Sequence, residues 1–238
     1  MFDIPSLRRE TRYGMPAADQ VLFNRHYVLG YSYYFRQAKW ALEIVDPNST
    51  DLQRADNYRP DYRIPEMFRV DLADYEKSGY DRGHLVASAN QNELAIQNSE
   101  TYLLSNMAPQ IPAFNRGIWK KLETAVRALD AKPEIYETYV ICGPIFDFDT
   151  AVARIGTKDN NGLSLPVPNA YFKSILTEDH KGGLDVWSFV IPNLDTNKPL
   201  DAFLVPTTMV ERLSGIFLWE RLQGKKIDKE KSAVKAMW

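Results

Sequence analysis

The sequence predicts an α+β fold with a mainly antiparallel central sheet flanked by helices. Two observations lead to this fold class. Segments with strand-like spacing of apolar and aromatic residues outnumber segments with helical spacing. Neighbouring strand-like segments are joined locally, as by Lys181-Gly182-Gly183, which is typical of a hairpin. Local hairpins favour an α+β fold over a doubly wound sheet, in which helices separate parallel strands.

The N-terminal half is predicted to contain strands followed by loops. Residues 22–36 mix apolar and aromatic residues at strand spacing, with His26 inside that strand, and residues 39–43 continue a second strand. Residues 46–66 are rich in Asp, Asn, Arg and Pro and are interpreted as an exposed loop. Residues 71–84 contain Gly79 and Gly83 and are interpreted as a loop that leads into an irregular turn.

The C-terminal half begins with the clearest helix. Pro109 and Pro112 precede residues 113–129, whose apolar residues recur at steps of three and four. A central strand is expected over residues 134–146, ending at a turn at Gly143-Pro144, and two more strands at 169–176 and 186–191, with His180 in the polar turn between them. Residues 200–213 fit a strand or a helix, and the charged tail at 224–235 fits a short helix or a disordered end.

Length and composition are those of a globular protein. The 238 residues, 45% of them hydrophobic, can bury a sizeable core. We find no internal repeat or low-complexity linker, and therefore expect residues 1–238 to form a single domain, with a core at about 12–222 and a charged tail at 224–238. The net charge is only −2, which argues against a nucleic-acid coat protein but not against an enzyme with a locally basic cleft.

The chain has no feature of a membrane or secreted protein. No segment approaches the roughly 18 apolar residues that a membrane helix needs. The first residues, MFDIPSLRRETRYG, lack the apolar stretch of a signal peptide, so we expect a cytoplasmic protein or one processed from a longer precursor. Cys142 is the only cysteine and follows an apolar run, which indicates a buried residue without a catalytic role.

Of the three histidines, His84 has the most suggestive neighbours. Asp81-Arg82-Gly83-His84 is interpreted as a compact turn that presents a base and a guanidinium close together. A neutral imidazole can take a proton from water, and an arginine can bind phosphate oxygens through its two-pronged guanidinium. The structural alternative is a turn held together by an Asp–Arg pair. His26 and His180 are interpreted as structural.

The predicted helix carries a second set of polar residues. Asn115, Trp119, Glu123 and Arg127 follow one another at steps of four and form a slowly rotating stripe beside the apolar face. The simpler interpretation is a solvated face with a Glu123–Arg127 pair. The functional interpretation gives Asn115 and Glu123 a hard cation, because Mg²⁺ prefers oxygen ligands and keeps several waters. No HxH, HExxH or CxxC spacing suggests zinc, and neither a glycine-rich phosphate loop nor a GxSxG motif is present.

These residues resemble the DNA/RNA non-specific endonucleases of the ββα-metal superfamily. The resemblance covers about residues 12–220 and its segments occur in the family's order. It includes YGMP (13–16), RADNYRPD (54–61), DYEKSGYDRGH (74–84), TYLLSNMAPQ (101–110), NRGIWKKLE (115–123) and VPNAYFK (167–173). One departure is Ala87, where the family often has proline.

The resemblance implies a role for each matching residue. His84 corresponds to the general base, Asn115 to the direct metal ligand, and Glu123 to the acid that holds the metal's water shell. Further residues correspond to arginines that bind phosphate or stabilise the transition state: Arg54, Arg82 and Arg127, with Arg116 as an additional substrate-binding residue. Arg59 and Arg63 compete with Arg54 for its role, because the loop after Arg54 is shorter here.

The resemblance also implies a Mg²⁺-dependent endonuclease, with Mn²⁺ as a substitute, that cleaves DNA and RNA without sequence specificity. Two alternatives remain at this stage: an inactive relative that only binds nucleic acid, and a phosphodiesterase for small substrates. Relatives in this family are often homodimers, and an intracellular nuclease needs restraint, so a protein inhibitor or regulatory partner is a further expectation. No membrane partner is expected.

Overall fold

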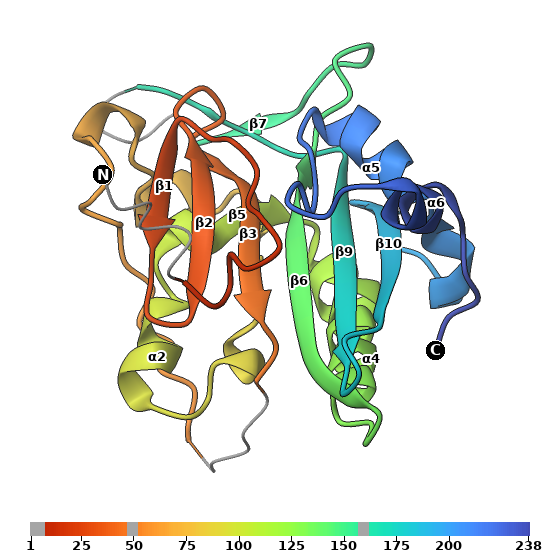
Figure 1. The fold of residues 1–238 in the computed structure, drawn as a ribbon. Helices are drawn as coiled ribbons and strands as arrows, with labels where there is room; N and C mark the ends of the chain where they lie inside the picture. Colours follow the sequence, from red (N-terminus) through yellow and green to blue (C-terminus); the bar gives the residue numbers. More distant parts are fainter. Residues whose placement is uncertain (1–7, 47–51, 157–161) are drawn as a thin grey trace.

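A seven-stranded antiparallel sheet forms the centre of the fold (Figure 1). The computed structural model describes residues 8–46, 52–156 and 162–238. In their order across the sheet the strands are β1 (Gln20–Phe23), β2 (Tyr27–Ser32), β3 (Gln37–Ile44), β6 (Ile135–Ile145), β9 (Ala170–Asp179), β10 (Leu184–Pro192) and β11 (Leu204–Val205). The predicted α+β class, with a mainly antiparallel sheet, is confirmed.

Both faces of this sheet are buried, because successive side chains of a strand point to opposite sides. In β9, Tyr171 and Ile175 belong to one hydrophobic core, whereas Phe172 and Leu176 belong to the other. Lys173 is buried on the same face as Tyr171 and lies against Trp119. A charged residue at a core-facing position requires a compensating interaction.

Helices cover each face of the sheet (Figure 1). On one face, α3 (Pro112–Phe114), the π-helical turn η5 (Asn115–Trp119) and α4 (Lys120–Asp130) follow one another without a break. Their apolar side chains pack into the core that includes Tyr171. On the opposite face lie α5 (Thr207–Ser214) and α6 (Lys225–Ser232), which contribute Val210 and Ile227 to the second core.

A second, two-stranded ladder leads into the helix α3–α4. Strand β4 (Asp81–His84) pairs antiparallel with β5 (Met107–Gln110), so that His84 lies opposite Met107. The helical segment begins two residues after β5, which gives the ββα order expected from the resemblance. Other short elements are η2 (Glu66–Phe68), α1 (Leu72–Tyr75), η3 (Ser88–Asn90), α2 (Ala95–Glu100), η4 (Leu104–Asn106) and the pair β7 (Arg154–Ile155) with β8 (Leu165–Pro166).

The segment Asp81–His84 is a strand, so the predicted turn is wrong. Gly83 does not adopt a positive φ. Its lack of a side chain matters instead for packing, because an added Cβ would lie 2.1 Å from Cδ of Gln110. The structural alternative, a turn held together by an Asp–Arg pair, does not occur either, because Asp81 binds Arg116.

Three other boundaries differ from the sequence expectations. The first predicted strand is two strands, β1 and β2, and His26 lies in the bend between them. Gly143 and Pro144 lie inside β6, whose pairing with β9 continues to Ile145. The loop expected at 46–66 is free of helices and strands over residues 52–65, η2 begins at Glu66, and Asp61 and Ile64 are buried within it. Residues 47–51 fall outside the described residues.

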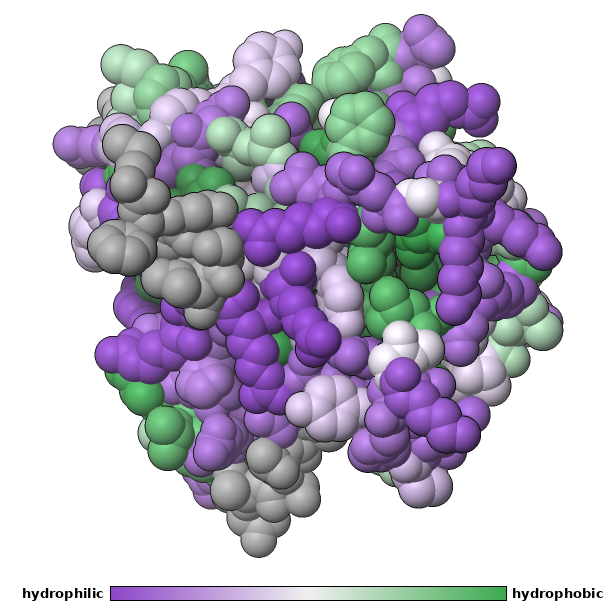
Figure 2. All heavy atoms as spheres, viewed as in Figure 1, coloured by the Kyte–Doolittle hydropathy of each residue, from purple (hydrophilic) through white to green (hydrophobic). Residues whose placement is uncertain are grey.

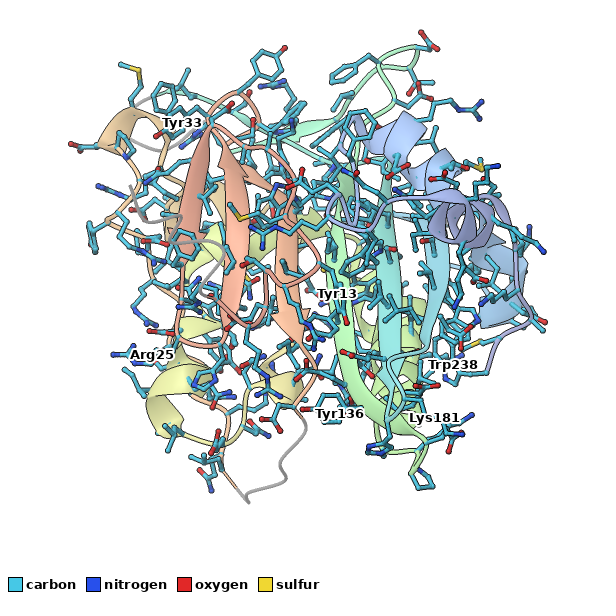
Figure 3. All side chains as sticks on the ribbon, viewed as in Figure 1. Tyr13, Arg25, Tyr33, Tyr136, Lys181 and Trp238 are labelled. Atoms are coloured by element: carbon cyan, nitrogen blue, oxygen red, sulfur yellow. The ribbon has the colours of Figure 1, made fainter. Side chains whose placement is uncertain are left out.

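The C-terminal region is ordered around the sheet. Residues 200–213 form a 3-10 turn η6 (Leu200–Phe203), strand β11 and most of α5, so both of the expected structures occur. After α6 the chain continues to Trp238, which lies beside β10 (Figure 3). There its indole nitrogen donates a hydrogen bond to the carbonyl oxygen of Ala125 in α4. The charged tail is therefore a helix followed by an extended segment that contacts α4.

The face shown in Figure 2 is mostly covered by hydrophilic side chains, with smaller hydrophobic areas between them. Among the described residues, no helix is long and apolar enough to cross a membrane.

Candidate active site

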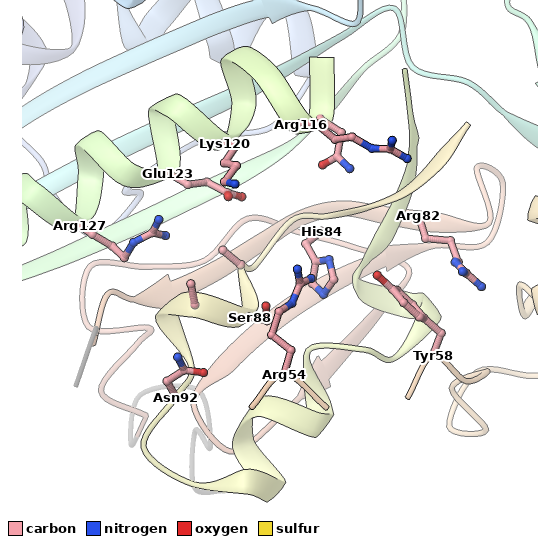
Figure 4. Close-up of a pocket in the computed structure, with 13 residues that line it drawn as sticks. Arg54, Tyr58, Arg82, His84, Ser88, Asn92, Arg116, Lys120, Glu123 and Arg127 are labelled. Carbon is pink, nitrogen blue, oxygen red and sulfur yellow. The ribbon is translucent and has the colours of Figure 1, made fainter. Parts of the chain in front are cut away.

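A cavity of about 310 Å³ lies between β4 and the helix η5–α4 (Figure 4). All seven residues that the sequence assigned to a site line it. The lining residues are Arg54, Tyr58, Arg82, His84, Ala87, Ser88, Ala89, Asn92, Asn115, Arg116, Lys120, Glu123 and Arg127. Residues that are up to 73 positions apart in the sequence therefore share one pocket.

His84 lies at the centre of this pocket, at the end of β4 (Figure 4). Its ring makes edge contacts with the rings of Tyr58 and Tyr102, with centroids 6.0 Å and 5.0 Å away. Its Nε2 atom is buried and has no hydrogen-bond partner among the described residues. Burial, followed by the charge of Arg54, lowers the pKa of His84 to about 3. The neutral, proton-accepting imidazole is therefore the form present near neutral pH.

Asn115 is positioned by an interruption of the helix. It begins the π-helical turn, in which Gly117 has non-helical dihedral angles (φ −100°, ψ −106°). Such single π turns are rare and often occur at functional sites. The side-chain Nδ2 donates a 2.9 Å hydrogen bond to Oδ2 of Asp81. Because the carboxylate fixes the orientation of the amide, Oδ1 of Asn115 is left without a hydrogen-bond donor in the part of the chain that the structure describes.

Glu123 lies two turns further along the same helix and is half-buried. Its carboxylate makes no hydrogen bond or ion pair with any described residue, so the Glu123–Arg127 pair of the simpler interpretation is absent there. Burial raises the pKa of Glu123, and the charges of Lys173 and Arg127 oppose this rise. A half-buried carboxylate without a donor is costly unless a cation or water occupies the space in front of it.

These two side chains fit a hard divalent cation. They offer an amide oxygen and a carboxylate oxygen, which are the donors that Mg²⁺ takes while it keeps several waters. Among residues 8–46, 52–156 and 162–238, no group of three or more His, Cys, Asp and Glu side chains could hold a metal by itself. The donor set thus fits a metal that is bound mostly through water, and does not fit a closed zinc site.

Arg54 and Arg82 lie on the side of the pocket opposite α4 (Figure 4). Arg54 donates from Nε to the hydroxyl oxygen of Tyr102 at 2.9 Å, and this bond is the main reason that its pKa is raised. The guanidinium of Arg82 lies 4.2 Å from the ring centroid of Tyr58. Both are held by neutral aromatic groups, so each keeps its full charge for an anion.

The competing arginines are used elsewhere. Arg59 donates to backbone oxygens of Asn57 and Ser99, and Arg63 binds the carboxylate of Asp61. Neither lines the cavity. Of the three candidates for the family's loop arginine, only Arg54 reaches the pocket.

The arginines of the helix differ from each other. Arg116 is exposed at the rim and binds Asp81 through Nε and Nη2, so a phosphate would have to compete with this pair. Arg127 donates from Nη1 to Oδ1 of Asn90 at 3.0 Å and from Nη2 to the hydroxyl of Thr124. It has no acidic partner among the described residues.

Two aspects of the pocket were not predicted from the sequence. Trp119 leaves the expected polar stripe and is buried in the core, because a four-residue step drifts around a helix and the π turn shifts the phase further. Lys120, and not Trp119, lines the pocket one turn before Glu123. It could have been predicted from the sequence, because residues three positions apart lie on the same side of a helix. Tyr58, Ser88 and Asn92 also line the pocket, without a sequence signal that we can identify.

The pocket is strongly cationic although the whole chain is slightly acidic. Five of its lining side chains are cationic (Arg54, Arg82, Arg116, Lys120 and Arg127) and one is acidic (Glu123). The net charge of the chain is −2. The positive charge is thus concentrated where a phosphodiester could meet both His84 and Asn115.

Comparison with known proteins gives one consistent family. The model of the DNA/RNA non-specific endonuclease family matches residues 6–224. Mitochondrial endonuclease G of Caenorhabditis elegans is 32% identical over 94% of this chain and 76% of its own length, and that of Homo sapiens is 33% identical over 86% and 71%. A solved structure described as the EndoG/EndoGI complex and the mechanism of EndoG inhibition has a TM-score of 0.83 and 30% identity, and the match covers 94% of this chain and 95% of that one.

Proposed function

The chain belongs to the DNA/RNA non-specific endonuclease family and is a phosphodiester hydrolase of that family; we propose that it cleaves DNA and RNA by a single-metal mechanism with Mg²⁺. The observation that carries the proposal is the shared pocket. Around one cavity of about 310 Å³ lie an uncharged histidine, several cations, and an amide oxygen and a carboxylate that have no partner among the described residues.

Nucleases of this family depend on a metal ion. We propose Oδ1 of Asn115 as the direct protein ligand and Glu123 as the residue that holds the metal through water. Mg²⁺ is favoured by the oxygen donors, and Mn²⁺ is expected to substitute because it takes similar ligands. When bound, the metal would neutralise charge on the phosphate and stabilise the leaving oxygen.

The side chains of the pocket would perform the remaining steps. His84 takes a proton from a water molecule as that water attacks phosphorus. The bond from phosphorus to the 3′-oxygen breaks, and this oxygen takes a proton from a second water molecule, which gives a 5′-phosphate and a 3′-hydroxyl. Arg54, Arg82 and Arg127 would bind non-bridging oxygens, whose negative charge grows in the transition state. Arg116 would contact substrate at the rim, after exchanging Asp81 for phosphate.

The surroundings of the pocket favour a polymeric substrate over a small phosphodiester. A larger cavity of about 940 Å³ adjoins it and shares five lining residues with it: Arg54, Tyr58, Arg82, Asn115 and Arg116. A nucleic-acid strand would therefore have space on that side of the reacting phosphate. The lining of the pocket is mainly cationic, so binding should be to the phosphate backbone.

Three further expectations concern partners and location. The solved relative was crystallised with an inhibitor, and we propose that a protein inhibitor of this chain would cover the cationic pocket. A homodimer stays a prediction, which the mass in solution would test. Several relatives are named as mitochondrial, and the expected cytoplasmic location of this chain likewise stays a prediction.

The experiment that tests the proposed function compares substrates in the presence and absence of metal. The protein is incubated with supercoiled plasmid, single-stranded DNA, RNA and bis-p-nitrophenyl phosphate, with Mg²⁺ or with EDTA. We expect cleavage of all three polymers that EDTA abolishes and Mn²⁺ restores. Turnover of the small ester alone would support the small-substrate phosphodiesterase. Binding of DNA without any metal-dependent cleavage would support the inactive relative.

A further inference from the structure

A buried hydrogen-bond chain leads from the pocket into the sheet. Arg127 donates to Oδ1 of Asn90, and Nδ2 of Asn90 donates to Oε1 of Glu43 at 3.0 Å. Asn90 and Glu43 are 2% and 1% exposed. Glu43 lies in β3 and does not line the pocket. Among the described residues, its hydrogen-bond path to the proposed phosphate-binding arginine runs through Asn90.

The donors and acceptors fix the direction of each hydrogen bond between Arg127, Asn90 and Glu43. Above its pKa the carboxylate of Glu43 is ionised and only accepts hydrogen bonds, so it holds the NH₂ end of the Asn90 amide. The oxygen end of the amide must then face Arg127, which only donates. The other carboxylate oxygen of Glu43 accepts from Nε2 of Gln91 at 3.1 Å, and Gln97 in turn donates to Gln91. Each amide in the network thus has one permitted orientation.

The buried carboxylate has a matching cation on the same side of the sheet. Burial raises the pKa of Glu43 to about 7, and the charge of Lys173 opposes this rise. Lys173 is itself buried, and its Nζ lies 4.4 Å from the ring centroid of Trp119. The indole nitrogen of Trp119 donates a long, 3.3 Å bond to the carbonyl oxygen of His84. Lys173 in β9 is thus a counter-charge for Glu43, as it also is for Glu123.

We propose that Glu43 is a positioning residue, which acts on the reaction by orienting Asn90 and, through it, the guanidinium of Arg127. The inference rests on the proposed function, in which Arg127 binds the scissile phosphate. This positioning role explains why the buried strand β3 carries the carboxylate of Glu43 beside the pocket. An apolar residue there would avoid the free-energy cost of burying a charge.

The chain offers a rescue experiment. In Glu43→Gln, an NH₂ group replaces one of the two carboxylate oxygens that accept from Asn90 and Gln91. One of these two donors then faces another donor, and a single amide oxygen remains to accept from both. In Asn90→Asp, two carboxylates face each other at the distance of a hydrogen bond. In the double variant all three bonds can re-form, and only the one between positions 43 and 90 is reversed. The new amide on β3 would donate to the new carboxylate on η3 and accept from Gln91, and that carboxylate would still accept from Arg127. We expect each single variant to lower kcat/KM on DNA by about 10-fold, and the double variant to recover most of that loss.

A double-mutant cycle with Arg127→Ala separates positioning from a loss of structure. If Glu43 acts through Arg127, Glu43→Gln should lower kcat/KM in the parent and change it by less than about two-fold in the Arg127→Ala background. The fall in kcat/KM that Glu43→Gln causes in the parent background should come mainly from kcat, because Arg54, Arg82 and Lys120 still bind the nucleic-acid backbone. Melting curves of all variants report folding.

Glu137→Gln is the matched control, because Glu137 is a buried carboxylate of β6 that binds Arg9 and Tyr139 and has no link to the pocket. It should change the melting temperature and leave kcat/KM unaltered. The inference is overturned if Glu43→Gln lowers activity equally in both backgrounds, if the double variant is no better than the singles, or if Glu137→Gln loses as much activity. If the parent itself cleaves nothing, the proposed function fails instead.

Discussion

Gly83→Ala tests how the glycine beside the proposed general base is used. An added Cβ would lie 2.1, 2.2 and 2.4 Å from Cδ, Oε1 and Cγ of Gln110. Ordinary contact begins near 3.4 Å, so the side chain of Gln110 would have to retreat by more than 1 Å. Gln110 is fully buried on the neighbouring strand, and little space is available for that movement.

The expected cost follows from overpacking of a buried site, which is typically about 1–3 kcal/mol. For a chain of this length each kcal/mol lowers the melting temperature by roughly 2–4 °C. A shift of β4 would also displace His84, the next residue, and misplacement of a catalytic group by about 1 Å can cost on the order of 10²-fold in rate. We therefore expect lower stability together with a loss of activity of at least about 10-fold.

Thermal unfolding and plasmid cleavage are measured for Gly83→Ala, Gln110→Ala and the double variant. Both amide atoms of Gln110 lack hydrogen-bond partners in the described part of the chain, so truncation sacrifices no such bond there. It should make room for the new methyl group, and the double variant should be more stable than Gly83→Ala. A melting temperature of Gly83→Ala equal to that of the parent, or no relief in the double variant, would refute the packing argument.

Two further predictions concern charge. First, the pKa of Glu43 is about 7 in the folded protein, against an ordinary value of 4.5. Between these two pH values the folded state binds more protons than the unfolded state. The free energy of unfolding should therefore fall as the pH rises through this range, by on the order of 3 kcal/mol. Glu43→Gln should remove this slope, and parallel stability curves for parent and variant between pH 4.5 and 7 would contradict it. Second, affinity for DNA should fall with added salt, and Lys120→Met should reduce the slope of log K against log salt concentration by about one; an unchanged slope would show that Lys120 does not contact phosphate.

The sequence was informative wherever local spacing carried the information. The helix from Pro112 to Asp130, strand β6 and the β9–β10 hairpin lie close to their predicted positions, because their apolar periodicity reflects the faces that they bury. The resemblance named seven residues that the fold brings to one pocket. Their chemical roles remain proposals, which kinetic measurements on substituted proteins would test.

The sequence was less informative where tertiary contacts decide. The conformation of Asp81–His84 is set by pairing with β5, more than twenty residues away, and not by its own glycine. Asn90 and Glu43 became visible only as partners of Arg127, because strand β3 and the turn η3 meet only in the folded chain. The π turn at Asn115 likewise has no periodic signature, although it decides which residues of the helix face the pocket.

The central claim is that His84 removes a proton from water beside a metal held at Asn115. The most direct test is the rate of Mg²⁺-dependent plasmid nicking by His84→Ala, with circular dichroism and melting curves to show that the variant is folded. A general base contributes about 10²- to 10⁴-fold, so we predict a folded variant whose rate is at least about 100-fold lower than that of the parent. A folded His84→Ala protein that nicks plasmid at the parent's rate would contradict the mechanism.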